Sequence, residues 1–218
     1  MHAFLFDLDG VLVDTARFHF LAWQRLAHQL GFEFTETQNE ALKGISRMDS
    51  LEIVLKTGGI QATNEEKLRY AEEKNAYYLR LCSEMTPADV LPGVLNFIRQ
   101  ARERGILIGL GSASKNAGTI LDHVGLRPYF DTIVDGNRVR KSKPDPEVFQ
   151  IGAADLGVLP GSAVVFEDAV AGVEAAKRAG MKVVGIGDPA ILKEADRVFP
   201  NFEGLSLTQL EELAAETK

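Results

Sequence analysis

Residues 4–15 read FLFDLDGVLVDT, and this short stretch decides how the rest of the chain is interpreted. Most of its side chains are strongly apolar, yet carboxylates stand at Asp7, Asp9 and Asp14. Burying an unpaired charge is costly, so buried carboxylates are normally neutralised, paired or bound to a metal ion. We therefore expect a positively charged partner close to Asp7 and Asp9.

Five short β-rich segments follow one another along the chain, at 3–6, 106–110, 132–134, 163–166 and 182–186. Helical patterns follow three of them, at about 115–124, from near Pro146, and over 169–179. Strands that alternate with helices at this spacing indicate a parallel sheet covered on both faces. We therefore predict an α/β fold, a doubly wound parallel sheet whose ligands bind beyond the carboxyl ends of the strands.

Residues 15–85 break this alternation. Apolar residues recur at helical spacing from Phe18 to Leu30, and a second stripe runs from Leu68 to Cys82 in a long helix that Asn64 is placed to cap. We predict a helical cap domain over 15–85, inserted into an α/β core domain formed by 1–14 and 86–218.

Two of the predicted strands end in residues suited to a phosphate or a metal ion. Asp7 and Asp9 follow the first strand, and in an extended chain residues two apart point to the same side, about 6–7 Å from each other. The segment 111–116, GSASKN, follows the second strand and places small residues ahead of a helix. The free N–H groups at the start of such a helix favour an anion.

The other two strand ends carry a lysine and two further carboxylates. Pro144 disfavours helix at Lys143, while Asp145 is expected to cap a helix that begins at Pro146. Lys143 is thereby expected near the carboxyl edge of the sheet. The acidic pair 167–168, Glu-Asp, ends the fourth strand and adds hard oxygen ligands.

Together these residues predict phosphoryl transfer. Mg²⁺ prefers one or two carboxylates plus phosphate and water oxygens, and with Lys143 it would neutralise Asp7 and Asp168 and shield a substrate phosphate. Each motif alone is as readily explained by a helix cap or a solvated side chain. All four in order, each at a strand end, favour a site.

In these motifs the sequence resembles the haloacid-dehalogenase-like phosphotransferases. The resemblance covers the whole chain and rests on residues 7–15 (DLDGVLVDT), Ser112, Lys143 with Pro144, and Glu167 with Asp168. It implies that Asp7 is a nucleophile that forms an aspartyl-phosphate, and that Asp9 is the general acid/base. It also implies that Lys143 and Ser112 hold the transferring phosphate. The Mg²⁺ ligands that it implies are the side chain of Asp7, the backbone carbonyl of Asp9, and Asp168, with Glu167 nearby.

The predicted cap carries a narrower resemblance. Residues 43–50, KGISRMDS, are similar to the cap signature of the β-phosphoglucomutase subfamily. This implies a mutase that interconverts β-D-glucose 1-phosphate and glucose 6-phosphate through glucose 1,6-bisphosphate, with Arg47 gripping the phosphate that does not react. A sugar-phosphate phosphatase is the alternative, because it shares the core motifs without needing the cap cations. The substrate-binding residues that the resemblance implies are Thr15, His19, Trp23, Lys43, Gly44, Arg47, Ser50, Lys74, Ser112, Ala113, Ser114, Lys115, Asn116 and Lys143.

Simpler interpretations stand beside three of these residues. Ser46 is equally well placed to cap a helix on which Arg47 is solvated. His19 is retained as a residue that positions the cap, and Trp23 is most simply part of the core.

Composition excludes several classes of protein. The 218-residue chain carries a formal net charge of −7, which argues against a nucleic-acid binder. Cys82 is its only cysteine, so no intramolecular disulfide forms and a reducing compartment is expected. No signal peptide is visible and no apolar run approaches the ~20 residues that span a membrane. We expect a cytoplasmic monomer that acts on a small sugar phosphate, without membrane or nucleic-acid partners.

Overall fold

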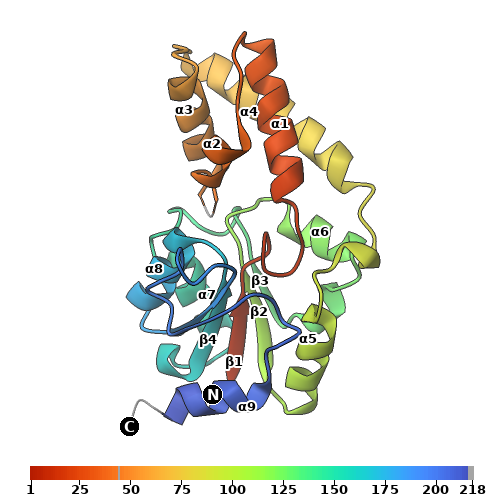
Figure 1. Ribbon diagram of the computed structural model, residues 1–218, viewed down its shortest axis with the longest axis vertical. Coiled ribbons are helices and arrows are strands. Elements are labelled where there is room, and N and C mark those ends of the chain that lie inside the picture. The colour runs from red at the N-terminus through yellow and green to blue at the C-terminus, as the bar shows by residue number, and fades with distance from the viewer. Residues whose placement is uncertain (44, 216–218) are drawn as a thin grey trace.

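The computed structural model describes residues 1–43 and 45–215 of the chain, which form a six-stranded parallel sheet below a group of helices (Figure 1). The strand order is β3-β2-β1-β4-β5-β6, and helices cover both faces of the sheet. This confirms the predicted α/β class. The strands are β1 (Ala3–Phe6), β2 (Leu107–Gly111), β3 (Thr132–Val134), β4 (Ala163–Glu167), β5 (Lys182–Ile186) and β6 (Arg197–Phe199).

Strand β1 lies at the centre of the sheet, paired with β2 on one side and β4 on the other. Its side chains alternate between two cores, so every residue of the strand is buried and the run is continuously apolar. Phe4 and Phe6 join the core under one set of helices, while Ala3 and Leu5 join the core under another. The first set is α5 (Val94–Glu103), α6 (Ala117–His123) and α9 (Leu207–Ala215), and the second is α7 (Glu147–Asp155) and α8 (Val170–Arg178).

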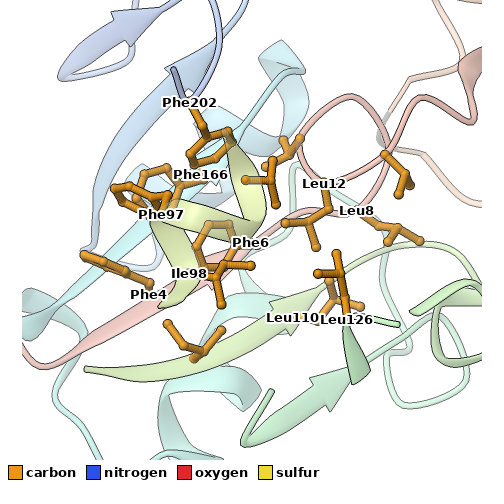
Figure 2. Close-up of a cluster of buried hydrophobic side chains, with 14 of the residues drawn as sticks. Phe4, Phe6, Leu8, Leu12, Phe97, Ile98, Leu110, Leu126, Phe166 and Phe202 are labelled. Carbon is orange, nitrogen blue, oxygen red and sulfur yellow. The ribbon is translucent and has the colours of Figure 1, made fainter. Parts of the chain in front are cut away.

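A cluster of phenylalanines fixes β1 in place (Figure 2). The rings of Phe6 and Phe166 stack with centroids 4.7 Å apart, and Phe4 meets Phe166 edge-on at 5.2 Å. Phe97 and Phe202 close the cluster from α5 and from the segment that follows β6. Burying each ring stabilises the fold by about 1.5–3 kcal/mol, so the strand end that carries Asp7 rests on a rigid base.

Four helices of the described chain stand above the carboxyl edge of the sheet: α1 (Ala16–Gln29), α2 (Glu36–Glu40), α3 (Arg47–Thr57) and α4 (Asn64–Cys82) (Figure 1). They have a hydrophobic cluster of their own, which includes Trp23, Leu51 and Val54. The last turns of α4 instead bury Tyr78 and Cys82 in the core of the sheet. Among the described residues, no helix combines the length and apolarity that a membrane crossing requires.

The two connections between the sheet and these helices run side by side. Val13 and Val90 form an antiparallel bridge, and the Leu91 amide donates to the Leu12 carbonyl at 2.9 Å. The chain therefore leaves and re-enters the sheet at one place. The domain boundaries expected at 15 and 85 fall at these connections and stay a prediction.

Local details differ from the sequence predictions at three places. β6 was not predicted, because it is a three-residue, half-buried edge strand without an apolar run. Helix α4 is capped by Thr63 rather than by Asn64, since Thr63 and Glu66 form a reciprocal capping box. Helix α7 begins at Glu147, with Pro146 at the cap position, and Asp145 instead accepts from the Glu147 amide.

Candidate active site

A cavity of about 870 Å³ lies between the carboxyl edge of the sheet and helices α1–α4. Asp7 and Asp168 reach it from the ends of β1 and β4, Ser112 from the end of β2, and Lys143 from the loop before α7. The strand-end residues predicted from sequence are thus brought together. The predicted residues that line the cavity are Asp7, Asp9, His19, Trp23, Lys43, Arg47, Ser50, Lys74, Ser112, Ala113, Ser114, Lys115, Asn116, Lys143 and Asp168.

The floor of this cavity is the side formed by the carboxyl edge of the sheet. Lys143 is the positive partner of the buried carboxylates there. Its ammonium donates to Asp7 Oδ1 at 2.6 Å, to Glu167 Oε1 at 2.5 Å and to the Gly111 carbonyl at 3.0 Å. Only 3% of Lys143 is exposed. Burial disfavours its charge, but Asp7 and Glu167 outweigh burial and raise the pKa of Lys143 above its usual range. The amine therefore stays charged at every physiological pH.

Asp9 stands beside Asp7 but in a different environment. Its backbone amide donates to Asp7 Oδ2 at 3.0 Å, while its own Oδ1 is buried without a hydrogen-bond partner among the described residues. His19 Nε2 lies 3.9 Å from Asp9 Oδ2. Burial, and then the charge of Asp7, raises the pKa of Asp9 to about 8. A carboxyl with this pKa holds a proton at neutral pH, which is the form that a general acid needs.

Asp7, Glu167 and Asp168 form an acidic cluster that fits a divalent metal ion. One carboxylate oxygen from each lies within 4.8 Å of the others. Burial, and then the charge of Glu167, raises the pKa of Asp168, so a cation at this cluster would be strongly favoured. Glu167 is fully buried, with Oε1 on Lys143 and Oε2 accepting from the Ala169 amide at 3.0 Å. It therefore orients Lys143 as well as adding negative charge to the cluster.

Two glycines make room for these carboxylates. A Cβ at Gly10 would lie 2.1 Å from Asp168 Oδ2, and one at Gly172 would lie 1.9 Å from Glu167 Cδ. Gly10 also has φ +81°, which a side chain would strain. Neither glycine was singled out from the sequence, because the close approach is visible only once the loop after β1 and helix α8 are folded against β4.

The loop after β2 forms a small-residue turn that faces the cavity. Ser112 Oγ accepts from the Ser114 amide at 3.1 Å, and Ser114 Oγ accepts from the Asn116 amide at 3.2 Å. Asn116 in turn donates through Nδ2 to Asn75 Oδ1 on α4 at 2.8 Å. This loop therefore contributes to the site and also joins the sheet to the helices above it.

The helical side of the cavity carries cations without carboxylate partners among the described residues. Ser46 caps α3 through the Asp49 amide, and the half-buried Arg47 opens that helix beside the cavity. Ser46 is thus a helix cap, while Arg47 lines the cavity, and the grip of Arg47 on a phosphate stays a prediction. Lys74 is 3% exposed and its nearest polar partner is His19 Nδ1, at 2.9 Å.

Comparison with known proteins places this architecture in a family. A family model for haloacid dehalogenase-like hydrolases matches residues 1–180. The chain belongs to this family.

Individual members of this family are similar to the chain over nearly its whole length. The β-phosphoglucomutase of Bacillus subtilis is 44% identical over 214 residues, which cover 97% of this chain and 95% of the relative. The crystal structure of β-phosphoglucomutase from Clostridium difficile has a TM-score of 0.96 at 43% identity, covering 99% of this chain and 98% of that chain. The phosphorylated carbohydrates phosphatase of Thermotoga maritima is 34% identical over 206 residues, covering 91% of this chain and 93% of the relative.

Two described residues among the predicted site residues of this haloacid dehalogenase-like chain do not line the cavity. Thr15 is fully buried at the N-cap position of α1. Glu167 lies behind Lys143 rather than on the cavity wall. Gly44 lies outside the described residues.

Other residues of this chain reach the site without having been predicted there. Asn39 lines the cavity with its Oδ1 buried and lacking a partner among the described residues. Ser142 donates to Asp49 Oδ2 at 3.0 Å and so joins the loop before α7 to α3. A lone asparagine or serine in a helix or loop carries no sequence signal, since only the folded cavity shows what it faces.

Proposed function

We propose that this chain is a Mg²⁺-dependent phosphomutase that interconverts β-D-glucose 1-phosphate and glucose 6-phosphate through a glucose 1,6-bisphosphate intermediate. The observation that carries the proposal is the division of charge in one cavity. Its floor pairs Lys143 with Asp7 and Glu167, while Arg47 and Lys74 on the helical side have no described carboxylate partner. One phosphate would react at the floor, and a second would be held from above. The 44% identity to a β-phosphoglucomutase supports the same substrate.

The reacting groups are Asp7 and Asp9. When the Asp7 carboxylate attacks phosphorus, the bond to the sugar oxygen breaks and an aspartyl-phosphate forms. Transfer of that phosphoryl group to the free hydroxyl of the sugar phosphate yields the bisphosphate. Asp9 takes the proton from the attacking hydroxyl and returns it to the sugar oxygen that leaves in the opposite step. Lys143 holds Asp7 through Oδ1 and neutralises charge as phosphate approaches.

The side chains of Asp7 and Asp168 and the backbone carbonyl of Asp9 would hold Mg²⁺, with Glu167 beside them. The bound ion would neutralise the carboxylates and the phosphate, so that one anion can attack another. The compact acidic cluster and the space kept free by Gly10 and Gly172 support this assignment.

The distal phosphate would be held by Arg47 together with Ser114, Lys115 and Asn116. Arginine suits this role because its planar guanidinium binds phosphate with two parallel hydrogen bonds. We propose that residues 15–85 close over the sugar as a cap, hinged where Val13 and Val90 pair. A closed cap excludes water, which would otherwise hydrolyse the aspartyl-phosphate.

Product analysis tests the proposal. With Mg²⁺ and a trace of bisphosphate as primer, β-glucose 1-phosphate should yield glucose 6-phosphate, and a chelator should remove the activity. Free glucose and inorganic phosphate would instead establish a sugar-phosphate phosphatase, the activity named for the Thermotoga maritima relative. We further propose that the protein is a cytoplasmic monomer, consistent with its single, buried cysteine, and size-exclusion chromatography with light scattering tests its mass.

A further inference from the structure

Lys74 is a buried amine that makes or breaks no bond in the proposed phosphoryl transfer. Its Nζ lies 4.5 Å above the ring of Trp23 and 4.8 Å above that of Tyr78. It contacts His19 Nδ1 at 2.9 Å and borders the cavity of about 870 Å³. Two aromatic faces and an imidazole thus surround a group that lysines normally keep in water.

The other lysines of the cavity have different surroundings. Lys43 pairs with Glu40 at 2.9 Å, Lys141 with Asp145 at 3.3 Å, and Lys143 with Asp7 at 2.6 Å. Lys115 is exposed to solvent. Among the described lysines that line the cavity, only Lys74 is both buried and without a carboxylate partner.

The charge state of Lys74 follows from this environment. Burial, and then the charge of Arg47, lowers the pKa of Lys74 to about 7, against an ordinary value of 10.5. Asp9 opposes this shift but does not cancel it. About half of the amines are therefore neutral at pH 7, whereas fewer than about one in a thousand ordinary lysines are. The titratable or charged groups around Lys74 are His19 on α1, Arg47 on α3, Tyr78 and Cys82 on α4, and Asp9 after β1.

We propose that Lys74 is a site of reversible imine formation for aldehydes that carry a phosphate group. The phosphate would bind the cations and N–H groups of the cavity, and the aldehyde would meet the buried amine. This proposal depends on the proposed function in one respect, which is that the cavity binds a sugar phosphate.

The chemistry needs no further reagent. The nitrogen lone pair attacks the carbonyl carbon, and the carbonyl oxygen takes up a proton to give a carbinolamine. Loss of water then leaves a C=N bond, so amine and aldehyde give imine plus H₂O. In the His19 tautomer that carries its proton on Nε2, Nδ1 accepts one N–H of Lys74, and the lone pair of the neutral amine stays free.

Imine formation distinguishes glucose 6-phosphate from β-glucose 1-phosphate. Glucose 6-phosphate opens to a free aldehyde at C1 and still carries its phosphate at C6. In β-glucose 1-phosphate, C1 is bonded to the phosphate oxygen and the ring stays closed. The imine would therefore form with the product of the proposed forward reaction and not with its substrate.

Pyridoxal 5′-phosphate, followed by borohydride reduction, tests the site on the full-length protein. We expect one equivalent of label, mapped by peptide mass spectrometry to Lys74, with labelling that rises with pH around 7. Inorganic phosphate should protect, and pyridoxal, which lacks the phosphate, should label at least tenfold less. Lys74→Arg should lose at least tenfold of the label, whereas Lys141→Arg, a control at a lysine that lines the same cavity and pairs with Asp145, should retain most of it.

The proposal fails if the label spreads over Lys115 and surface lysines, if phosphate gives no protection, or if labelling of Lys74 rises only near pH 10. Phosphate protection and the pH profile are measured on wild type, so the test does not depend on the folding of a variant. Labelling needs no turnover. A chain that labels at Lys74 but makes no glucose 6-phosphate would refute the mutase alone, and the reverse result would refute the imine site alone.

Discussion

The two sides of the cavity treat positive charge in opposite ways. At the floor, Lys143 is enclosed by two carboxylates and a carbonyl, and these contacts raise its pKa. On the helical side, Lys74 is equally buried but rests on aromatic rings, and its pKa is lowered to about 7. Two lysines, each 3% exposed, thus differ in whether the protein itself supplies the counter-charge.

This contrast shows that the charges at the floor are paired within the protein before a ligand binds. The positive charges of Arg47 and Lys74 on the helical side have no such partner among the described residues and are available to a bound anion. The floor holds its nucleophile by fixed hydrogen bonds, as preorganised catalysis requires. The helical side leaves Arg47 and Lys74 without a described carboxylate, which destabilises the empty cavity and favours a bound anion. This account predicts that changes at the floor stop the chemistry, while changes on the helical side alter substrate selection.

The largest effect is expected at the floor from Asp7→Asn. An amide is a poor nucleophile and a weaker metal ligand, so mutase turnover should be abolished. Initial rates with β-glucose 1-phosphate, measured on a variant whose circular dichroism matches wild type, check this. More than a trace of activity would eliminate the covalent mechanism.

Asp9→Asn should be the next most severe change. General acid–base catalysis contributes about 10²–10⁴-fold, and the loss should appear in transfers to and from the sugar hydroxyl. A donor with a good leaving group, such as acetyl phosphate, needs little protonation and should still phosphorylate Asp7. Near-normal mutase rates would assign the proton transfer to another residue.

Stability provides a direct contrast between the two lysines. Lys143→Met leaves Asp7 and Glu167 buried without their partner and should lower the free energy of unfolding by about 3–5 kcal/mol. Lys74→Met removes a buried cation that has no counter-ion and should be neutral or stabilising at pH 7. Urea unfolding of both variants measures this. Equal losses would show that Lys74 is stabilised by its surroundings as strongly as Lys143 is.

The same contrast predicts a dependence on pH. The pKa of Lys74 is about 7 when folded and 10.5 ordinarily, so between these values the unfolded chain binds more protons than the folded one. Wild-type stability should therefore rise with pH relative to Lys74→Met, by up to about 1.4 kcal/mol per pH unit. Well below pH 7, where Lys74 is protonated in both the folded and the unfolded chain, the difference should be constant. Urea titrations from pH 6 to about 9 check the slope, and a difference that does not change with pH would contradict a lowered pKa.

The sequence predicted the floor more fully than the helical side. β1 is continuously apolar because it is buried on both faces, so its carboxylates stood out, and parallel strands bring Asp7, Ser112 and Asp168 to one edge whatever the details of the loops. The contact between Lys74 and His19 joins residues 55 apart on two helices, and no local pattern records it.

The other features that the sequence did not predict have similar physical causes. The space that Gly172 leaves for Glu167 depends on how closely α8 approaches β4. β6 forms by pairing with β5, since its own residues are only half buried. Each of these features depends on packing between elements that are distant in the sequence. Local secondary-structure propensity therefore does not predict it.

The central claim, that the helical side holds a phosphate that does not react, is tested most directly by Arg47→Ala with two donors. A charge-assisted contact is worth about 1.5–3 kcal/mol, so turnover of β-glucose 1-phosphate should fall by about 10- to 150-fold. Phosphorylation of Asp7 by acetyl phosphate, which has no distal phosphate, should change far less because the floor is intact. Equal losses with both donors would make Arg47 a residue that shapes or closes the cap. No loss with either would contradict the claim and leave the phosphatase as the better account.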